Sequence, residues 1–338
     1  MHVSYPARHG QLVLRTEEDW NRDIKPIAVS DDGTTWSFRL RANQPFLYFK
    51  PCLLRGREFR WSVGPNKLLL MAERDERVFY PFFFGPDRGR FLPLIEFRSG
   101  ILGRVHRIRV YLPPGYDENT LTNHPVAYMQ DGQNLFFPEE AFRTHWRISE
   151  TSQTLRAMSA IEDFIIIGIH SADRMRDYTH PGYRKYARSV AEEIVPETQR
   201  LLRIHRHRRY RTVWGSSLDG VVSFYTVWEH PHVFGTAICM SSTFSHKDNL
   251  IERVLKEPAR DVAFYLDSGW PGDNYEVTMG MAMALVSRGW RYGHNLLHLC
   301  FPHAEHDEKA WGLRLHLPLQ FINGAVARAS RAAAPVLG

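Results

Sequence analysis

Residues 212–220 of the 338-residue chain read Thr-Val-Trp-Gly-Ser-Ser-Leu-Asp-Gly, and this stretch decides the fold. Its apolar start, residues 212–214, predicts a buried strand, and residues 221–230 predict a helix. A serine on the tight turn between such a strand and helix holds its hydroxyl exposed at the helix N-terminus. The arrangement therefore predicts Ser217 as a nucleophile, with Gly215 allowing the close approach that the turn imposes.

Short apolar runs also occur at residues 126–129, 164–169 and 263–266, separated by stretches of helix length. Continuous apolar runs of this kind are typical of strands buried on both faces, as in a parallel sheet covered by helices. Alternation of such strands with helices predicts a doubly wound α/β domain. We place this domain at residues 91–324.

The N-terminal part of the chain has a different pattern. Residues 10–15 and 36–41 alternate apolar with polar side chains, which is the period of a half-buried strand. Residues 31–33, Asp-Asp-Gly, indicate a turn between them. These features predict a small antiparallel β-sandwich at residues 1–90, with residues 85–90 as the linker to the second domain.

Length and composition agree with two folded cores. Hydrophobic residues make up 43% of the chain and charged residues 24%, which excludes a disordered protein. The N-terminus lacks the pattern of a secretory signal, and no apolar run approaches the ~20 residues that span a membrane. We therefore expect a cytoplasmic protein with no membrane partner, ending in a flexible tail at residues 325–338.

The chain has a net charge of +6, and its densest basic run lies at residues 203–211. This run leads directly into the strand at residue 212, so we expect a solvated helix end and loop, and no nucleic-acid partner. Cys52, Cys239 and Cys300 lie far apart in apolar stretches. They are expected to be buried hydrophobic residues rather than parts of a disulfide framework or a metal site.

A serine hydroxyl needs a histidine to take its proton and a carboxylate to orient that histidine. In this kind of fold the acid and then the histidine follow the serine along the chain. His306 follows a predicted strand at residues 295–300 and is preferred to His303, which lies nearer the strand end. Asp273 is preferred as the acid, with Asp267 in reserve at the end of the preceding strand.

Hydrolysis through a serine also requires two amide groups that face the developing oxyanion. The residue after the nucleophile, Leu218, is expected to supply one of them. The second is expected from Gln133, in the loop after the strand at residues 126–129, where Gly132 lets the backbone turn tightly. The alternative for this loop is a simple turn.

Several motifs occur together and in a fixed order: Val110-Tyr111-Leu112-Pro113-Pro114-Gly115-Tyr116, Asp131-Gly132-Gln133-Asn134-Leu135-Phe136, Gly168-Ile169, Gly215-Ser216-Ser217-Leu218, and His306-Asp307-Glu308 followed by Trp311. With them the chain resembles the putative-esterase family, which includes esterase D, enterochelin esterases, feruloyl esterases and mycolyltransferases. The resemblance covers roughly residues 104–323.

The resemblance implies an α/β-hydrolase doubly wound sheet, here preceded by the small all-β sandwich. It implies a serine esterase that needs no metal or cofactor and cleaves a small-molecule or carbohydrate ester through an acyl-enzyme. Ser217 and His306 fall on the family's motif positions, and Asp273 completes the Ser-His-Asp triad.

Asp219 departs from the family pattern, which has glycine at this position. Its carboxylate either replaces glycine harmlessly in the first helical turn, where the helix dipole favours it, or places negative charge near the oxyanion. The second alternative would favour an acyltransferase or a ligand-binding protein with weak hydrolysis.

The first domain resembles a starch-binding sandwich in residues 46–50 and 59–66. Lys50, Trp61 and Asn66 fall on the positions that hold a sugar in such modules, and an indole face suits stacking on a pyranose ring. Immunoglobulin-like modules of this kind also precede enterochelin esterases, and Trp61 could then be a core residue.

Overall fold

The computed structural model describes residues 1–7, 10–71 and 77–324, so the predicted tail at residues 325–338 lies outside the described residues. The chain divides into two compact units. The first contains Met1–Arg90, to which Pro113–Asn123 and Leu155–Ala160 also belong. The second contains Phe91–Leu112, His124–Thr154 and the chain from Ile161 onward.

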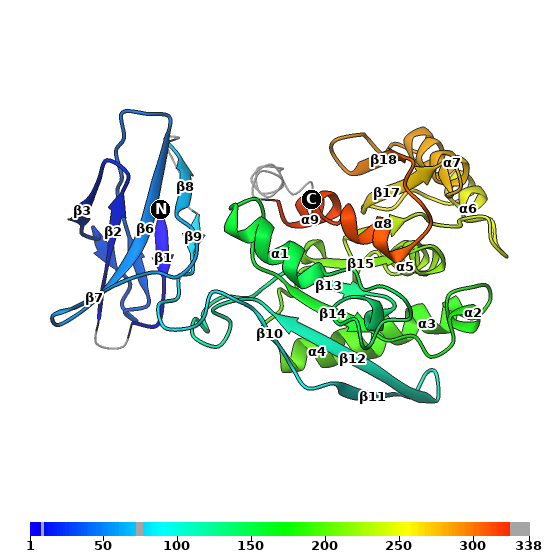
Figure 1. The fold of residues 1–338 in the computed structure, drawn as a ribbon, viewed down its shortest axis with the longest axis horizontal. Helices are drawn as coiled ribbons and strands as arrows, with labels where there is room; N and C mark the ends of the chain where they lie inside the picture. The colour runs from blue at the N-terminus through cyan, green and yellow to red at the C-terminus, as the bar shows by residue number, and fades with distance from the viewer. Residues whose placement is uncertain (8–9, 72–76, 325–338) are drawn as a thin grey trace. The chain divides into compact units, whose positions relative to one another are not determined.

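The first unit holds two β-sheets (Figure 1). The four-stranded sheet has the order β4-β5-β1-β9, with β1 (His2–Ser4), β4 (Ala28–Val29), β5 (Thr35–Ser37) and β9 (Val78–Phe79). The five-stranded sheet has the order β3-β2-β6-β7, with β8 pairing β6; its strands are β2 (Gln11–Thr16), β3 (Asp19–Ile24), β6 (Phe46–Arg55), β7 (Glu58–Trp61) and β8 (Lys67–Leu70).

The predicted antiparallel arrangement of this unit is wrong for one pair of strands. β1 and β9 are parallel, whereas the other pairs described in these two sheets are antiparallel. The strand predicted at residues 36–41 is also shorter, because β5 ends at Ser37. The core contains alternate residues of β2 and β6, and its aromatic members are Tyr5, Trp36, Phe38, Phe49 and Phe83.

The second unit is built on a nine-stranded sheet with the order β10-β12-β14-β13-β15-β16-β17-β18, in which β11 pairs β12. Its strands are β10 (Arg90–Phe91), β11 (Ile95–Ser99), β12 (Arg104–Leu112), β13 (Val126–Met129), β14 (Ile165–Ile169), β15 (Arg211–Ser216), β16 (Thr236–Met240), β17 (Ala263–Trp270) and β18 (Leu296–Pro302). β13 to β18 run parallel, whereas β11 with β12 and β12 with β14 are antiparallel.

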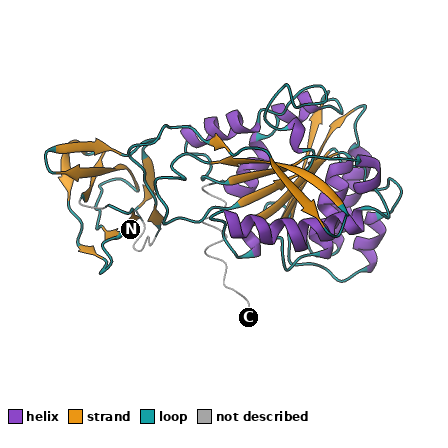
Figure 2. Cartoon of the chain, turned by 90° about the horizontal axis from the view of Figure 1, so that it is seen from below, coloured by secondary structure: helices purple, strands orange, loops and turns teal. Residues whose placement is uncertain are grey.

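Helices lie on both faces of this sheet (Figure 2). They are α1 (Ile148–Ala157), α2 (Arg174–Asp177), α3 (Tyr183–Ser189), α4 (Val195–Leu201), α5 (Leu218–Glu229), α6 (Leu250–Lys256), α7 (Tyr275–Ser287), α8 (Glu308–Leu313) and α9 (His316–Asn323). A π-helix, Val190–Ile194, joins α3 to α4, and short 3-10 helices occupy Gly132–Asn134 and Arg208–Tyr210. This architecture is the predicted α/β fold preceded by a β domain.

The parallel strands end at one edge of the sheet. Strand register aligns Met129 with Trp214, Ser216 with Met240, and Asp267 with Leu299. Ligands of open α/β sheets bind beyond the carboxyl ends of the strands. The loops after β13, β15, β17 and β18, which carry the predicted site residues, therefore meet at this edge.

Two expectations about individual side chains need correction. Arg211 begins β15 and is buried, with its guanidinium donating to the carbonyl oxygen of Val233 at 2.9 Å, so the basic run is not wholly solvated. Cys300 is exposed, because it lies in the half-exposed strand β18, whereas Cys52 and Cys239 are buried as expected.

In the described part of the chain, no helix is both long enough and apolar enough to span a lipid bilayer.

Candidate active site

Ser217 lies on the turn between β15 and α5, with φ of 53° and ψ of −120°. Its amide donates to the carbonyl oxygen of Met240 at 2.8 Å, which fixes the turn against β16. A Cβ atom on Gly215 would lie 2.4 Å from the carbonyl carbon of Asp219. Glycine is therefore required at residue 215, because the strand and the first helical turn touch there.

The structure brings Ser217, His306 and Asp273 together. His306 Nε2 is 2.9 Å from Ser217 Oγ, and His306 Nδ1 is 2.7 Å from Asp273 Oδ1. His306 comes from the loop after β18, and Asp273 from the loop after β17. Of the two candidate histidines, His306 is the one whose imidazole contacts the serine. The backbone amide of His303 donates to the carbonyl oxygen of Trp270.

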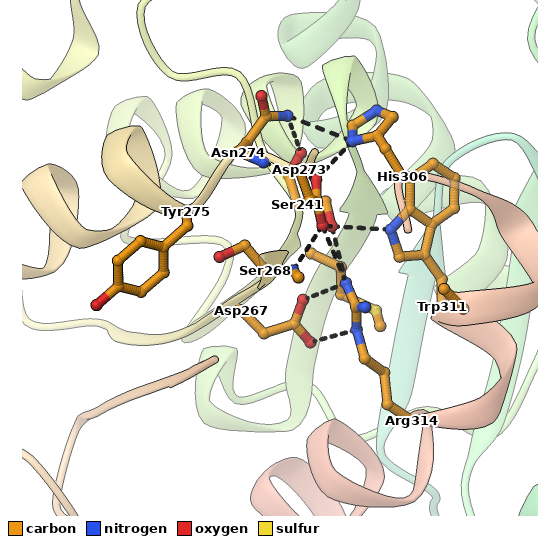
Figure 3. Close-up of polar contacts among 12 residues, drawn as sticks. Ser241, Asp267, Ser268, Asp273, Asn274, Tyr275, His306, Trp311 and Arg314 are labelled. Carbon is orange, nitrogen blue, oxygen red and sulfur yellow. Dashed lines mark hydrogen bonds and ion pairs between the residues drawn. The ribbon is translucent and has the colours of Figure 1, made fainter. Parts of the chain in front are cut away.

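Asp273 accepts four hydrogen bonds (Figure 3). Oδ1 accepts from His306 and from the amide of Asn274 at 2.7 Å, and Oδ2 accepts from the hydroxyl of Ser241 and the amide of Gly269 at 2.6 Å. Burial raises the pKa of this carboxyl, but the four hydrogen bonds outweigh burial and lower it. Asp273 is thus held as a carboxylate facing the imidazole.

The segment after β13 differs from its prediction in detail. The residue with the left-handed backbone is Asp131, at φ of 48°, and not Gly132. Glycine is needed at residue 132 because a Cβ there would lie 2.4 Å from the backbone of Gly168 in β14. The side chain of Gln133 donates to Ser171 Oγ at 3.1 Å and accepts from the amide of Ser171 at 3.2 Å. These bonds hold the segment against the loop that follows β14.

Leu218 is the first residue of α5. The first amides of a helix have no acceptor within the helix, and they lie at its positive end. The Leu218 amide is therefore available beside Ser217 for a developing negative charge.

Comparison with known proteins decides the family. The family model described as putative esterase matches residues 99–316. The chain belongs to the putative esterase family. With the family it belongs to the carboxylic ester hydrolases.

Relatives of this esterase-family chain are distant in sequence. It is 22% identical over 157 residues to YbbA of Bacillus subtilis (strain 168), a match covering 42% of this chain and 58% of YbbA. A ferulic acid esterase structure has a TM-score of 0.60 at 18% identity, covering 70% of this chain and 99% of that one. The enterobactin esterase FES from Shigella flexneri has a TM-score of 0.58 at 14% identity, covering 95% and 92%. At identities this low, the structural likeness shows a shared fold.

Asp267 of this esterase-family chain does not lie where the sequence placed it. β17 continues to Trp270, so Asp267 is inside the strand and buried. Its carboxylate pairs with Arg314 at 2.9 Å and accepts from the hydroxyl of Tyr265 at 2.9 Å. Burial raises its pKa, against the effect of Arg314. Asp267 is a structural partner of Arg314.

Sequence reasoning missed Ser241, which follows β16 and connects Asp273 to the helical C-terminal part (Figure 3). Its Oγ donates to Asp273 and accepts from Trp311 Nε1 at 2.9 Å and Arg314 Nη2 at 2.8 Å. An arginine inside the otherwise apolar stretch at residues 310–315 was the available signal, because a buried cation requires a buried anion.

The variant Ser241→Ala tests the connection between Ser241 and Asp273. Asp273 would lose one of its four donors, and a hydrogen bond to a charged group contributes about 1.5–3 kcal/mol. We expect kcat to fall about tenfold with KM unchanged, because ~1.4 kcal/mol of barrier is a factor of ten. Steady-state kinetics on an aryl ester measures this. Ser242→Ala is the matched control, because that hydroxyl donates to the carbonyl oxygen of Met240 instead; an equal loss in both variants would contradict the assignment.

Asp219 of this family member is buried and does not project into solvent. Its Oδ1 accepts from Arg174 Nη2 at 2.8 Å, and Nε of the same guanidinium lies 2.7 Å from Asp131 Oδ2. Burial, and next the nearby Asp131 carboxylate, raise the pKa of Asp219 well above its ordinary value. The carboxyl is therefore paired with a cation, which was not anticipated by either alternative from the sequence.

Lys50, Trp61 and Asn66 lie in the first unit of the chain. Trp61 pairs with Cys52 across β6 and β7, so it shares a sheet face with Lys50, and 38% of Trp61 is exposed. The Lys50 ammonium donates to the carbonyl oxygen of Gly64 at 2.8 Å, and burial lowers its pKa. Asn66 is exposed. Trp61 is not a core residue, and sugar binding by these three stays a prediction.

Proposed function

We propose that the chain hydrolyses carboxylic esters of small molecules or carbohydrates through an acyl-enzyme on Ser217. The observation that carries the proposal is the series of contacts from Ser217 Oγ to His306 Nε2, 2.9 Å, and from His306 Nδ1 to Asp273 Oδ1, 2.7 Å. A serine, a base and an orienting carboxylate in this series are the requirements of nucleophilic acyl transfer.

In the first half-reaction Ser217 Oγ attacks the ester carbonyl carbon while its proton passes to His306 Nε2. Asp273 accepts a hydrogen bond from the Nδ1–H of His306 and, as a carboxylate, stabilises the imidazolium that forms. The amides of Leu218 and Gln133 bind the oxyanion of the tetrahedral intermediate. When the intermediate collapses, the alcohol departs with the proton from His306, and the acyl group remains on Ser217.

In the second half-reaction His306 removes a proton from water as the water oxygen attacks the acyl carbonyl carbon. When this second tetrahedral intermediate collapses, the bond between the acyl carbon and Ser217 Oγ breaks, His306 returns the proton to Ser217 Oγ, and the carboxylic acid departs. The His306 side chain is 33% exposed, so water has access to the base. The pairing of Asp219 with Arg174 supports hydrolysis, because the carboxyl does not stand as an unpaired charge.

The names of the structural relatives support a choice of substrate class. They act, by their names, on ferulic acid esters and on enterobactin. An aryl-linked ester of a small molecule or carbohydrate is therefore the first substrate class to examine, with acetyl, butyryl and feruloyl esters as the panel.

Trapping the acyl-enzyme tests the mechanism. Rapid mixing with p-nitrophenyl acetate is expected to release one p-nitrophenol per protein in a burst, followed by slower turnover. Trypsin leaves residues 212–247 as one peptide, since it has no internal lysine or arginine. Fragmentation of this peptide is expected to place the acetyl group, or a fluorophosphonate label, on Ser217.

The same peptide contains Ser216 and Ser241, which makes it an internal control. A label on either of these serines, or hydrolysis without a burst and without any label, would contradict the proposal. Adding methanol during turnover measures transfer: a methyl ester product that exceeds the free acid would favour the acyltransferase alternative.

A further inference from the structure

Arg174 forms a bridge between two buried carboxylates that come from different loops. Its Nη2 donates to Asp219 Oδ1 at 2.8 Å, and its Nε lies 2.7 Å from Asp131 Oδ2. Asp131 and Asp219 are both buried. The Nη2 contact is a hydrogen bond, whereas the Nε contact is an ion pair without hydrogen-bond geometry. A guanidinium suits both contacts, because it remains charged and its nitrogens can face two carboxylates at once.

The two carboxylates stand next to the two proposed oxyanion donors. Asp219 directly follows Leu218, and Asp131 precedes Gln133 by two residues. The strands that carry these segments, β13 and β15, are paired up to Met129 and Trp214, and Gln130 then bonds the carbonyl oxygen of Trp214 at 2.9 Å. Beyond that point the Arg174 bridge connects the two segments.

The segment that carries Arg174 is itself well held. Asp173 caps α2 by accepting from the amide of Arg176 at 3.0 Å. Tyr178, just after the helix, donates its hydroxyl to Asp131 Oδ1 at 3.2 Å and is fully buried. Arg174 and Tyr178 therefore both bind Asp131 from one short, capped stretch of chain.

The bridge also accounts for the aspartate where the family has glycine. Glycine at residue 219 has no side chain to accept from Arg174, whereas the aspartate carboxyl does. The backbone and Cβ of Asp219 fit against β15 only because residue 215 is glycine, since a Cβ there would lie 2.5 Å from Asp219 Cβ. One cation between the two carboxyls limits the negative charge beside the oxyanion.

We propose that Arg174 is a positioning residue for ester hydrolysis: by bridging Asp131 and Asp219 it sets the separation of the Gln133 and Leu218 amides. This inference rests on the proposed function of Ser217. Arg174 contacts no reacting atom in this role. It holds the two segments so that both amides face the same point.

The test compares Arg174→Met with Arg176→Met in the full chain. Arg176 lies on the same short helix but is exposed, so it is the matched control. Displacing a catalytic group by about 1 Å costs about 10²-fold in rate. We expect kcat of Arg174→Met on p-nitrophenyl butyrate to fall about 10²-fold with KM within about twofold, and Arg176→Met to match the original protein.

A transition-state analogue separates positioning from a merely structural role. A trifluoromethyl ketone forms an oxyanion on Ser217, so its inhibition constant is expected to rise in Arg174→Met by about the factor lost in kcat. The inhibition constant of a matched methyl ketone, which remains largely a ground-state ligand, is expected to change little. Equal weakening of both ketones would overturn the proposal.

A double-mutant cycle with Asp219→Ala supplies a second measure. Alanine removes the oxygen that accepts from Arg174, so this variant is expected to lose kcat by about the same factor as Arg174→Met. Once Arg174 is methionine, Asp219→Ala is expected to have no further effect, because both changes break one bridge. Additive losses would contradict the bridge.

Failure of this inference differs from failure of the proposed function. If Ser217 of the original protein takes no acyl group, both fail. If Ser217 is acylated and Arg174→Met keeps its kcat, or only its KM rises, the bridge alone is wrong. If Arg174→Met does not fold, Arg174→Lys replaces it: the ammonium keeps the charge but cannot span both carboxylates, and kcat is expected to fall at least tenfold.

Discussion

Ser217→Ala is expected to lower kcat by on the order of 10⁶-fold, to the level that remains when an activated serine is removed from a hydrolase. His306 and Asp273 would still be in place, but no oxygen would attack the ester. Alanine has a Cβ like serine, so the substitution adds no backbone strain at φ of 53°, and the fold is expected to persist. Ester hydrolysis and circular dichroism on the same sample measure the two quantities.

Ser216→Ala is the control for that result. Ser216 ends β15 and is 1% exposed, and the hydroxyl that His306 Nε2 contacts is that of Ser217. Its loss is expected to leave kcat within about threefold of the original value. Full activity in Ser217→Ala together with a large loss in Ser216→Ala would mean that the nucleophile lies one residue earlier.

Asp273→Asn is expected to lower kcat by about 10⁴-fold, as removal of the orienting carboxylate does in a serine triad. The reason is that each carboxylate oxygen of Asp273 accepts from two donors. An asparagine must place its NH₂ group, which is itself a donor, against one of these two pairs of donors. If the NH₂ faces His306, the imidazole keeps its proton on Nε2 and cannot take the proton of Ser217.

Asp267→Asn is expected to have the opposite profile. Arg314 would keep its buried charge without a full partner, which costs about 3–5 kcal/mol of unfolding free energy. The kcat of the molecules that remain folded is expected to fall much less than in Asp273→Asn. Urea unfolding and active-site titration of each variant separate the two effects. A larger loss of kcat per folded molecule in Asp267→Asn would exchange the roles of the two acids.

Local patterns made part of the site predictable. Ser217 and Gly215 belong to one continuous segment of strand, turn and helix. The residue types next to this turn indicate its geometry. His306 follows a strand and precedes a helix whose first turn Asp307 caps by accepting from the amide of Ala310 at 2.7 Å. Choices of this kind depend on short-range chain geometry, which residue type indicates directly.

Partners far apart along the chain were not predictable. Arg174 and Asp219 are 45 residues apart, and Ser241 and Arg314 are 73 apart. A single sequence contains no signal that pairs one arginine with one acid at such a distance. For the same reason, the pairing of Asp219 with Arg174 was not predictable. The sequence left only two alternatives for Asp219, a helix-start residue or an unpaired charge.

The edge of the main sheet shows a further limit. β11 and β12 pair antiparallel, and β12 alternates exposed with buried residues at its start. Neither strand is a continuous apolar run, so the criterion that found the buried parallel strands did not apply to them. The length of β17 was underestimated in the same way, since Asp267 and Ser268 are polar but buried inside it.

Four residues just beyond the parallel strands have left-handed backbones: Asp131, Ser217, Ser241 and His303. Each costs of the order of 1–3 kcal/mol in a residue other than glycine. Heat tolerance and catalysis therefore compete at this edge of the sheet. Selection for survival at high temperature, without selection for turnover, would favour glycine at these positions. It would thereby remove Ser217, the proposed nucleophile, and the Ser241 hydroxyl that donates to Asp273 before it altered the hydrophobic core.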